Sequence, residues 1–302
     1  MTARVAVVGL GTVGSWLLRE LESGAAGDAE VVLRTSGRDG REGELADLDY
    51  DVLAECVSSP EDGEPGITFM RDAIARGRHV VTSDKWPVAL HGAELAATAH
   101  ERGVAFRAES TVMSGTPLLA PLTGALAGRR PTPLRGIVNA TVNQMLTRMA
   151  AGDTYEQALA GAQADGLAEP DPSADVDGRD EEAKAMILAA LVFGHGLSRG
   201  EVRVRGISRL DPGAVEEAAR EGLVLRSVTT IAPGTDGRLQ ASVKPVPLPA
   251  DDPLAPVSGV ENAVIVHAEG IGELRFQGPG AGPEIAGKGV LEDLRAVVDP
   301  PA

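Results

Sequence analysis

Five carboxylates crowd a short, proline-stiffened stretch that runs directly into a lysine-bearing segment. The stretch covers residues 168–180, and Lys184 follows its last carboxylate, Asp180, by four residues. On a helix beginning near Asp180, residues four apart share one face, so these two side chains can form an ion pair. An oriented ammonium beside several carboxylates can bind an amino-acid substrate and move a proton. A solvated acidic loop followed by a surface ion pair is the alternative, and spacing alone leaves both interpretations open.

A glycine-rich loop near the N-terminus is the second candidate for chemistry. The apolar run 5–8 leads into the sequence GLGTVG at 9–14, and a helical apolar pattern continues to residue 22. In a dinucleotide site the first glycine allows a tight turn, the second lets the backbone approach a pyrophosphate, and the third lets helix and strand pack closely. The pattern predicts a nucleotide site, and the alternative is an ordinary strand-to-helix turn. Its predicted cofactor-binding residues are Gly9, Gly11, Thr12, Val13 and Gly14.

The end of the second expected strand bears on the choice of cofactor. NAD sites usually carry an acidic residue there, which binds the ribose 2′-hydroxyl. Here the strand 31–33 is followed by Arg34 and Arg38, with no carboxylate before Asp39. Arginines can pair with a 2′-phosphate, so the sequence favours NADP over NAD, the alternative being that both arginines are solvated surface charges.

The elements that must position these residues fall into two groups. Strand patterns alternating with helical ones predict a parallel, doubly wound sheet of the Rossmann type in the first half. Beyond about residue 132, consecutive strands separated by turn residues predict an inserted α+β domain. The fold class is therefore α/β, with a nucleotide-binding domain of residues 1–130 plus 279–302 and a second domain of residues 131–278. We expect the last helix, 286–298, to pack back onto the first domain.

The composition excludes several classes of protein. A formal net charge of -16 argues against nucleic-acid binding, because phosphates would be repelled. No apolar run approaches the roughly 20 residues that a membrane span needs, and the N-terminus has no secretory-signal pattern. A single cysteine, Cys56, excludes a disulfide framework. These features predict a cytoplasmic protein whose partner is a small molecule.

The stretch 168–184 matches, position by position, the signature A-E-x-D-P-x-x-D-(V/L)-x-G-x-D-x-x-x-K of homoserine dehydrogenases. Four further segments resemble that family in order. Residues 79–85 look like HVVTANK, 109–117 like E-A-(S/T)-V-x-x-G-x-P, 135–143 like RGILNGTTN, and 278–282 like GxGAG. The chain therefore resembles the family over nearly its whole length.

The resemblance implies an NAD(P)-dependent interconversion of L-homoserine and L-aspartate 4-semialdehyde, a step of threonine and methionine biosynthesis. It implies that Lys184 and Lys85 are the catalytic pair, that Lys184 handles the substrate's proton, and that Asp180 orients Lys184. Alcohol oxidation would need the neutral amine, so activity in that direction is expected to rise toward alkaline pH. The implied substrate-binding residues are Glu169, Asp175, Gln144 and Thr141.

Further sites follow from the same resemblance. A monovalent cation, Na⁺ or K⁺, would be held mostly by backbone carbonyls beside the cofactor. The second domain is expected to pair with its copy in a homodimer. The implied cation ligands are Glu109, Val112, Ser114 and Thr116, and the further cofactor-binding residues are Ser58, Lys85, Gly280 and Gly282.

The chain departs from the family pattern in three features. Gln144 stands where the family usually has tyrosine, and Met113-Ser114 stands where many members have glycines. The chain is also of the short form, without a regulatory ACT domain, so threonine feedback is not expected. Two alternatives stay open: a related reductase acting on another small amino acid or aldehyde, and a nucleotide-binding regulator without catalysis.

Overall fold

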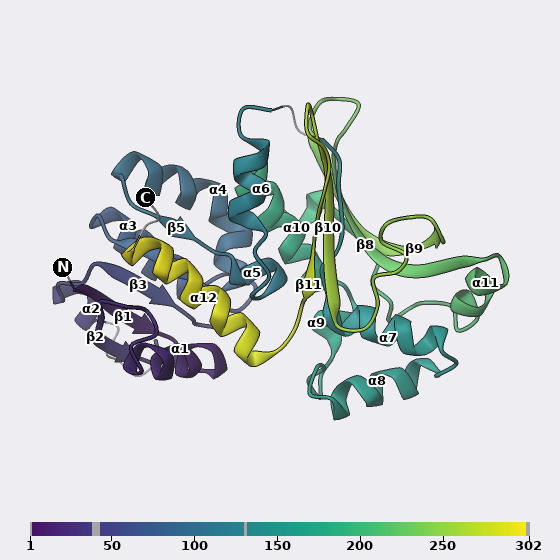
Figure 1. Ribbon diagram of the computed structural model, residues 1–302, viewed down its shortest axis with the longest axis horizontal. Coiled ribbons are helices and arrows are strands. Elements are labelled where there is room, and N and C mark those ends of the chain that lie inside the picture. Colours follow the sequence, from purple (N-terminus) through teal and green to yellow (C-terminus); the bar gives the residue numbers. More distant parts are fainter. Residues whose placement is uncertain (1, 38–42, 130–131, 300–302) are drawn as a thin grey trace. The chain divides into compact units, whose positions relative to one another are not determined.

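The computed structural model describes residues 2–37, 43–129 and 132–299 (Figure 1). The chain divides into two compact units. Unit 1 comprises Met1–Ala120, Ala190–Gly196 and Pro283–Ala302, and unit 2 comprises Pro121–Ala189 and Leu197–Gly282. The sequence places the domain boundaries at 130 and 279, whereas the structural units change at 120 and 282, with residues 190–196 joining unit 1.

Unit 1 contains a five-stranded sheet in the order β2-β1-β3-β4-β5. Every neighbouring pair is parallel, which confirms the doubly wound sheet predicted from the sequence. The chain leaves β1 toward β2 on one side and returns to β3 on the other, so the strand order reverses at β1 and β3, where doubly wound sheets bind ligands. The strands are β1 (Ala3–Val8), β2 (Ala29–Thr35), β3 (Val52–Glu55), β4 (His79–Thr82) and β5 (Phe106–Arg107).

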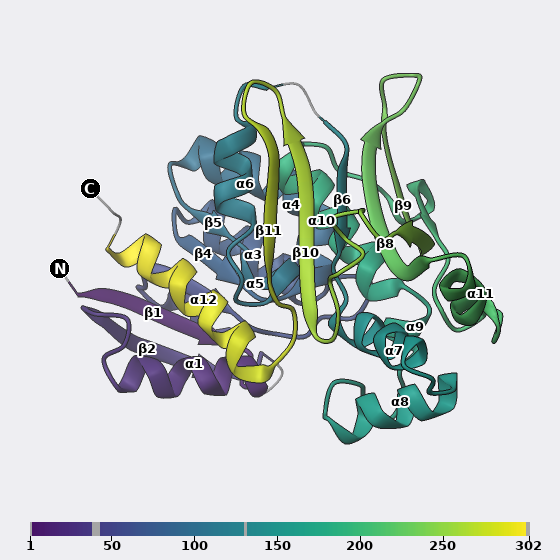
Figure 2. The ribbon, with the colours of Figure 1, turned by 45° about the vertical axis from the view of Figure 1, so that its right-hand side comes forward.

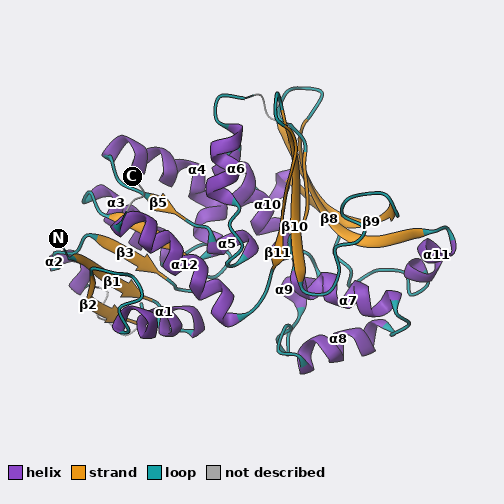
Figure 3. Ribbon diagram, in the orientation of Figure 1, coloured by secondary structure: helices purple, strands orange, loops and turns teal. Residues whose placement is uncertain are grey.

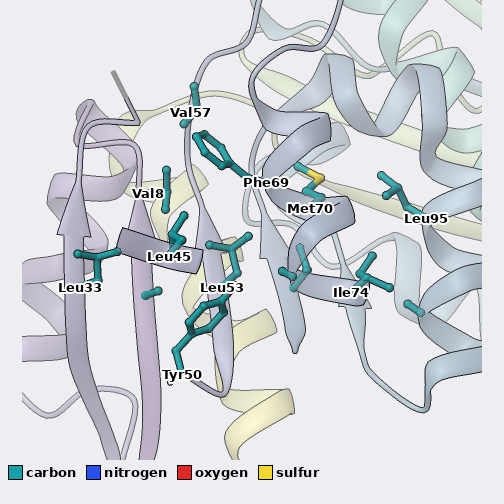
Figure 4. Packing of buried hydrophobic residues seen from close by; sticks show 14 residues of the cluster. Val8, Leu33, Leu45, Tyr50, Leu53, Val57, Phe69, Met70, Ile74 and Leu95 are labelled. Carbon is teal, nitrogen blue, oxygen red and sulfur yellow. The ribbon is translucent and has the colours of Figure 1, made fainter. Parts of the chain in front are cut away.

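Helices cover both faces of this sheet, and the side chains of β1 show why the strand is apolar throughout. Val5 and Val7 pack with α1 and α12 on one face. Ala6 and Val8 pack on the opposite face with α3 and α4, where Figure 4 shows Val8, Leu53, Met70 and Leu95 in one cluster. Successive strand residues point to opposite faces, so a doubly covered strand needs an unbroken apolar run. The helices before Pro121 are α1 (Thr12–Glu22), α2 (Glu44–Asp47), α3 (Gly66–Ala75), α4 (Lys85–Arg102), α5 (Ser110–Met113) and α6 (Leu119–Leu126, which ends in unit 2).

The last helix, α12 (Pro283–Val298), belongs to unit 1. Its Val290, Leu291 and Leu294 are buried in the same cluster as Leu17 of α1. A Cβ at Gly287 would lie 2.3 Å from the Trp16 ring, so glycine lets the two helices approach closely. The expectation that the last helix packs onto the first domain is confirmed.

Unit 2 is built on a six-stranded sheet in the order β11-β10-β6-β8-β9-β7. All its pairs are antiparallel except β7 with β9, so the sheet is mixed (Figures 2 and 3). The strands are β6 (Leu134–Ile137), β7 (Val202–Val204), β8 (Leu223–Pro233), β9 (Leu239–Pro249), β10 (Glu261–Ala268) and β11 (Gly272–Pro279). The helices are α7 (Ala140–Ala150), α8 (Tyr155–Ala164), α9 (Ser173–Val176), α10 (Arg179–Val192, its last turn in unit 1) and α11 (Ala214–Arg220), with a 3₁₀ turn at Arg199–Glu201.

Helix α7 supplies much of the core of unit 2. Val142, Met145, Leu146 and Met149 recur at helical spacing and are all buried in one cluster with Ala158 of α8. Within the described residues, no helix is long and apolar enough to cross a membrane.

Candidate active site

The predicted catalytic lysine of unit 2 is held by two short contacts. Lys184 lies on α10 and is 7% exposed. Its Nζ donates to the backbone oxygen of Val138 at 2.6 Å and lies 2.7 Å from Asp180 Oδ2. The ion pair predicted from the four-residue spacing is therefore present, and it is nearly buried rather than a surface pair. These two oxygen atoms fix the direction of the ammonium group. An ammonium has three N–H groups, so one of them can donate to another partner.

Asn139 joins the acidic stretch to this pair. It is the N-cap of α7, and its Oδ1 accepts from the Val142 N–H. Its Nδ2 donates to Asp175 Oδ1 at 2.8 Å and to Asp180 Oδ2 at 2.9 Å. One buried amide thus brings together two of the predicted carboxylates, 36 and 41 residues further along the chain.

A further carboxyl is buried next to the pair. Glu181 follows Asp180 on α10, is 1% exposed and accepts a hydrogen bond from Ser227 of β8. Burial, with the charge of Asp180 added to it, raises the pKa of Glu181 to about 7, against the hydrogen bond from Ser227 and the charge of Lys184. Sequence reasoning missed this group because the signature leaves its position unspecified.

The remaining predicted substrate residues lie in different surroundings. Glu169 is exposed at the start of the acidic stretch. Thr141 is buried, and its hydroxyl donates to the Leu167 carbonyl, which ties this stretch to α7. Gln144 is half-buried, and its Oε1 lies beside Gly259, where an added Cβ would be 3.6 Å away. The structure thus brings Asp175 and Asp180 to Lys184 and shows no recorded bond from Glu169 or Gln144 to that cluster.

In unit 1 the glycine loop has the geometry of a dinucleotide cradle. Gly9 has φ of +95°, and an added Cβ would lie 2.3 Å from the Cys56 carbonyl carbon. A Cβ on Gly14 would lie 1.8 Å from Gly9 O, so both glycines are required by internal packing. A Cβ on Gly11, by contrast, would have no atom within 4 Å.

The opening of α1 fits a phosphate group. Gly11 is the N-cap and makes no side-chain cap, and the first turn carries no acidic residue. Thr12 is exposed and Val13 is half-buried. None of the described residues comes close enough to require glycine at position 11. This is the position where a dinucleotide's pyrophosphate needs close approach to the backbone. The residues present therefore fit a nicotinamide dinucleotide.

The end of β2 shows one of the two predicted arginines. Arg34 Nη1 lies 2.8 Å from Glu22 Oε1, and both side chains are about half exposed. Such an exposed pair contributes at most about 1 kcal/mol and exchanges readily with another anion. Arg38 lies outside the described residues.

Two further predicted cofactor residues stand at the carboxyl edge of the sheet. Ser58 is exposed in the loop after β3. Lys85 is half-buried as the first residue of α4, directly after the buried Asp84. The sequence alone did not predict that two carboxyl groups, those of Asp84 and Glu55, are buried near Lys85.

Two glycines of the GxGAG turn are explained by the structure of the protein itself. A Cβ on Gly280 would lie 2.2 Å from the side-chain carbon of Asn262, a fully buried residue of β10. Gly282 has φ of +134°, a conformation that favours glycine. Close packing and backbone conformation thus account for both glycines, and their contact with a cofactor stays a prediction.

The predicted cation ligands lie in one turn of unit 1. Ser114 has φ of +55°, so the turn is in a conformation that is unusual for serine. The carboxylate of Glu109 accepts from the N–H groups of Leu118, Leu119 and Ala120, which secures the start of α6. Val112 is buried, while Ser114 and Thr116 are half-buried. Glu109 therefore uses its side chain for structure, and a cation would have to use backbone oxygens, as the sequence predicts.

Comparison with known proteins places this geometry in a family. The family model described as homoserine dehydrogenase matches residues 117–294. An NAD(+)-dependent homoserine dehydrogenase of Pseudomonas canavaninivorans is 41% identical over 83% of this chain and 71% of its own length. A homoserine dehydrogenase structure from Thiobacillus denitrificans has a TM-score of 0.86 at 30% identity, covering 99% of this chain and 74% of that one. A hyperthermophilic archaeal homoserine dehydrogenase mutant in complex with NADPH has a TM-score of 0.79 at 28% identity, covering 98% of both chains. The chain belongs to the homoserine dehydrogenase family.

Proposed function

We propose that this protein is an NAD(P)-dependent homoserine dehydrogenase, which interconverts L-homoserine and L-aspartate 4-semialdehyde. The observation that carries the proposal is the nearly buried Lys184, fixed by Asp180 and the Val138 carbonyl, in a chain that also carries a dinucleotide-type glycine loop. A fixed ammonium of this kind is suited to donate a proton to an oxygen that becomes an alcohol.

The chain's own residues account for the proton and for substrate orientation. In reduction of the aldehyde, Lys184 donates a proton to the developing alkoxide, and Asp180 holds the ammonium in place. In oxidation, the neutral amine of Lys184 takes the hydroxyl proton. Asp175 and the exposed Glu169 bind the substrate's α-ammonium group, and Lys85 adds positive charge at the carboxyl edge of the sheet.

A bound nicotinamide cofactor supplies the hydride chemistry. Gly11 and the N-terminus of α1 would hold its pyrophosphate. Arg34 would contact a 2′-phosphate by exchanging its partner Glu22, which supports the use of NADP. The Pseudomonas relative named NAD(+)-dependent supports NAD, so the preference is a separate prediction from the reaction itself.

Several finer features belong to the same proposal. The backbone oxygens of the turn that contains Ser114 would bind a monovalent cation. The protein would act as a homodimer through unit 2, in the cytoplasm. Thr141 positions the acidic stretch through Leu167, and Gln144 adjusts the substrate pocket.

The test is initial-rate absorbance at 340 nm with L-homoserine, run separately with NAD and NADP at alkaline pH. We expect turnover that falls at least about 10²-fold in Lys184→Ala. Lys244→Ala, which removes an exposed lysine of β9 in the same unit, is the control and should keep the wild-type rate. A protein that binds the cofactor but leaves homoserine untouched would refute the substrate, and a screen of other small amino acids and aldehydes would then test the role of Gln144.

A further inference from the structure

Two carboxyl groups are buried together at the carboxyl edge of the sheet in unit 1. Glu55 ends β3 and is fully buried, and Asp84, 4% exposed, is the N-cap residue of α4. Glu55 Oε1 accepts from the Val57 N–H at 2.9 Å, and its Oε2 accepts from the Thr82 hydroxyl at 2.5 Å. Glu55 therefore secures the backbone just beyond its own strand and the end of the neighbouring strand β4.

Asp84 secures the next part of the same loop. Both of its oxygens accept from the Ser59 N–H, at 3.2 and 3.0 Å. Ser59 in turn accepts from the Gly66 N–H at the start of α3. A Cβ on Gly66 would lie 2.8 Å from Asp84 Oδ2, so the helix begins in direct contact with this carboxylate. The two carboxyls thus hold residues 57–59 from both sides.

The pair lies in one hydrogen-bonded cluster. The Thr82 hydroxyl that donates to Glu55 also accepts from the Asp84 N–H at 2.9 Å, and two buried carboxylates so close together favour one shared proton. Burial raises the pKa of Glu55 most, and the negative charge of Asp84 raises it further. Burial also raises the pKa of Asp84, to about 6, against the opposing effects of Ser59 and the charge of Lys85. These effects favour a proton on Glu55 beside an ionised Asp84.

The other titratable groups against this pair are Cys56 and Lys85. Burial raises the pKa of the Cys56 thiol to about 12, so it stays neutral. Of the described residues, Lys85 is a cation whose charge lowers the pKa of Asp84. Where the HVVTANK segment has asparagine, this chain has Asp84, so the second carboxyl of the pair is a property of this chain.

The network also touches the glycine loop. A Cβ on Gly9 would lie 2.4 Å from the Val57 nitrogen, the same N–H group that donates to Glu55. Any shift of the 57–59 backbone is therefore transmitted to the loop that fits the pyrophosphate, and a change at Asp84 is transmitted to Lys85.

We propose that Glu55 and Asp84 are positioning residues that share one proton and hold residues 57–59, the glycine loop and Lys85 in the arrangement that binds the nicotinamide cofactor. The inference rests on the proposed function only for the identity of the cofactor. Loss of the shared proton places two negative charges side by side in a buried site, which loosens the network and weakens cofactor binding.

The test is equilibrium binding of NADH without substrate, followed by its fluorescence between pH 7 and 9.5, where NADH itself does not titrate. We expect wild-type affinity to fall at least fivefold across this range. Glu55→Gln keeps a donor toward Asp84 and cannot lose it, so its affinity should stay within about twofold of the neutral wild-type value at every pH. Glu55→Leu removes the bonds to Val57 and Thr82 and should weaken binding at least tenfold at pH 7. Circular dichroism at each pH separates these effects from unfolding, and Glu55→Gln, nearly isosteric, serves if Glu55→Leu does not fold.

The same pH profile in Glu55→Gln and the wild type would assign the titration to another group, such as Lys85, and overturn the inference. So would a wild-type affinity that does not change with pH. If the protein binds NADH with this profile but does not oxidise homoserine, the proposed function fails and the inference stands. Absence of binding of both NADH and NADPH at every pH overturns both.

Discussion

Lys184 Nζ and Asp180 Oδ2 lie 2.7 Å apart on consecutive turns of α10, in side chains that are 9% and 8% exposed. Removing one partner of a buried ion pair leaves the other uncompensated, which typically costs about 3–5 kcal/mol. Asp180 also accepts from Asn139, so the carboxylate holds the lysine and the N-cap of α7 together. The direction of the ammonium thus depends on this carboxylate together with the Val138 carbonyl.

We expect Asp180→Asn to lower kcat about 10²-fold, because the amide cannot hold the ammonium at the substrate oxygen. The variant should bind NADH as the wild type does, since Asp180 has no part in the glycine loop. Stopped-flow or steady-state rates together with NADH fluorescence provide both values. A wild-type kcat in a folded Asp180→Asn protein would contradict the orienting role.

Asn139→Ala should reduce both stability and turnover. It removes an N-cap, worth about 1 kcal/mol, and two hydrogen bonds to carboxylates of about 1.5 kcal/mol or more each. Thr154→Ala is the control, because it removes the N-cap of α8 without any contact to Lys184. Both variants should melt earlier by calorimetry, but only Asn139→Ala should lose kcat; equal kinetics in the two would show that Asn139 acts on stability alone.

The glycine loop allows a test that separates cofactor contact from packing. Gly14→Ala should fold poorly, because its Cβ would lie 1.8 Å from Gly9 O. Gly11→Ala should change the free energy of unfolding by less than about 1 kcal/mol, since its Cβ meets no atom and φ is -71°. We nevertheless expect NADH affinity to fall at least about tenfold, because a methyl group would obstruct the pyrophosphate. Unchanged affinity in Gly11→Ala would place the dinucleotide elsewhere.

Arg34→Ala tests the preference between cofactors. If Arg34 binds a 2′-phosphate, the Kd for NADPH should rise about tenfold while that for NADH changes less than about twofold. Stability should hardly change, since the exposed pair with Glu22 contributes at most about 1 kcal/mol. Arg19→Ala, an exposed arginine of α1, is the control. An unaltered ratio of the two Kd values would show that Arg34 does not bind the 2′-phosphate.

Glu181 gives stability a defined pH dependence. Its folded-state pKa of about 7 lies above the ordinary value of 4.5, so its contribution is fully present below about pH 4.5 and is lost as pH rises to about 7. Between pH 4.5 and pH 8.5 the stability of Glu181→Gln should therefore rise relative to that of the wild type by about 3 kcal/mol. Urea unfolding at both values measures this, with Glu217→Gln, an exposed glutamate, as control. Asp293, whose pKa burial raises to about 7, keeps part of the slope in every variant, and an unchanged slope in Glu181→Gln would contradict the prediction.

Local patterns predicted much of the fold. Helix α1 ends at Glu22, where the helical apolar pattern of the sequence stops. Strand β7 and helix α11 were not predicted. Val202–Val204 is three residues long and is held by parallel pairing with β9, and Ala214–Arg220 buries only Val215 and Ala218. Both depend on packing partners distant in sequence, which override weak local preference.

In the site, too, local sequence patterns predicted some contacts and missed those between residues far apart in the chain. The spacing of Asp180 and Lys184 predicted their ion pair, because helical periodicity is a local property. Asn139 could be recognised only as a helix cap, since its bonds to the carboxylates cross 36 and 41 residues. The contact of Glu55 with Asp84 joins the ends of two adjacent strands, and no local pattern reports which strands of a sheet are neighbours.

The return of α12 to unit 1 has a consequence for synthesis on the ribosome. The glycine loop leaves the ribosome first, yet Val290, Leu291 and Leu294 of its supporting core leave after all of residues 121–282. Closing a loop on the order of 160 residues costs roughly 4–5 kcal/mol of chain entropy if the loop is disordered. When unit 2 folds first, that loop becomes shorter and its closure costs less entropy. The nascent chain therefore folds at a lower entropic cost when unit 2 forms before unit 1 is complete.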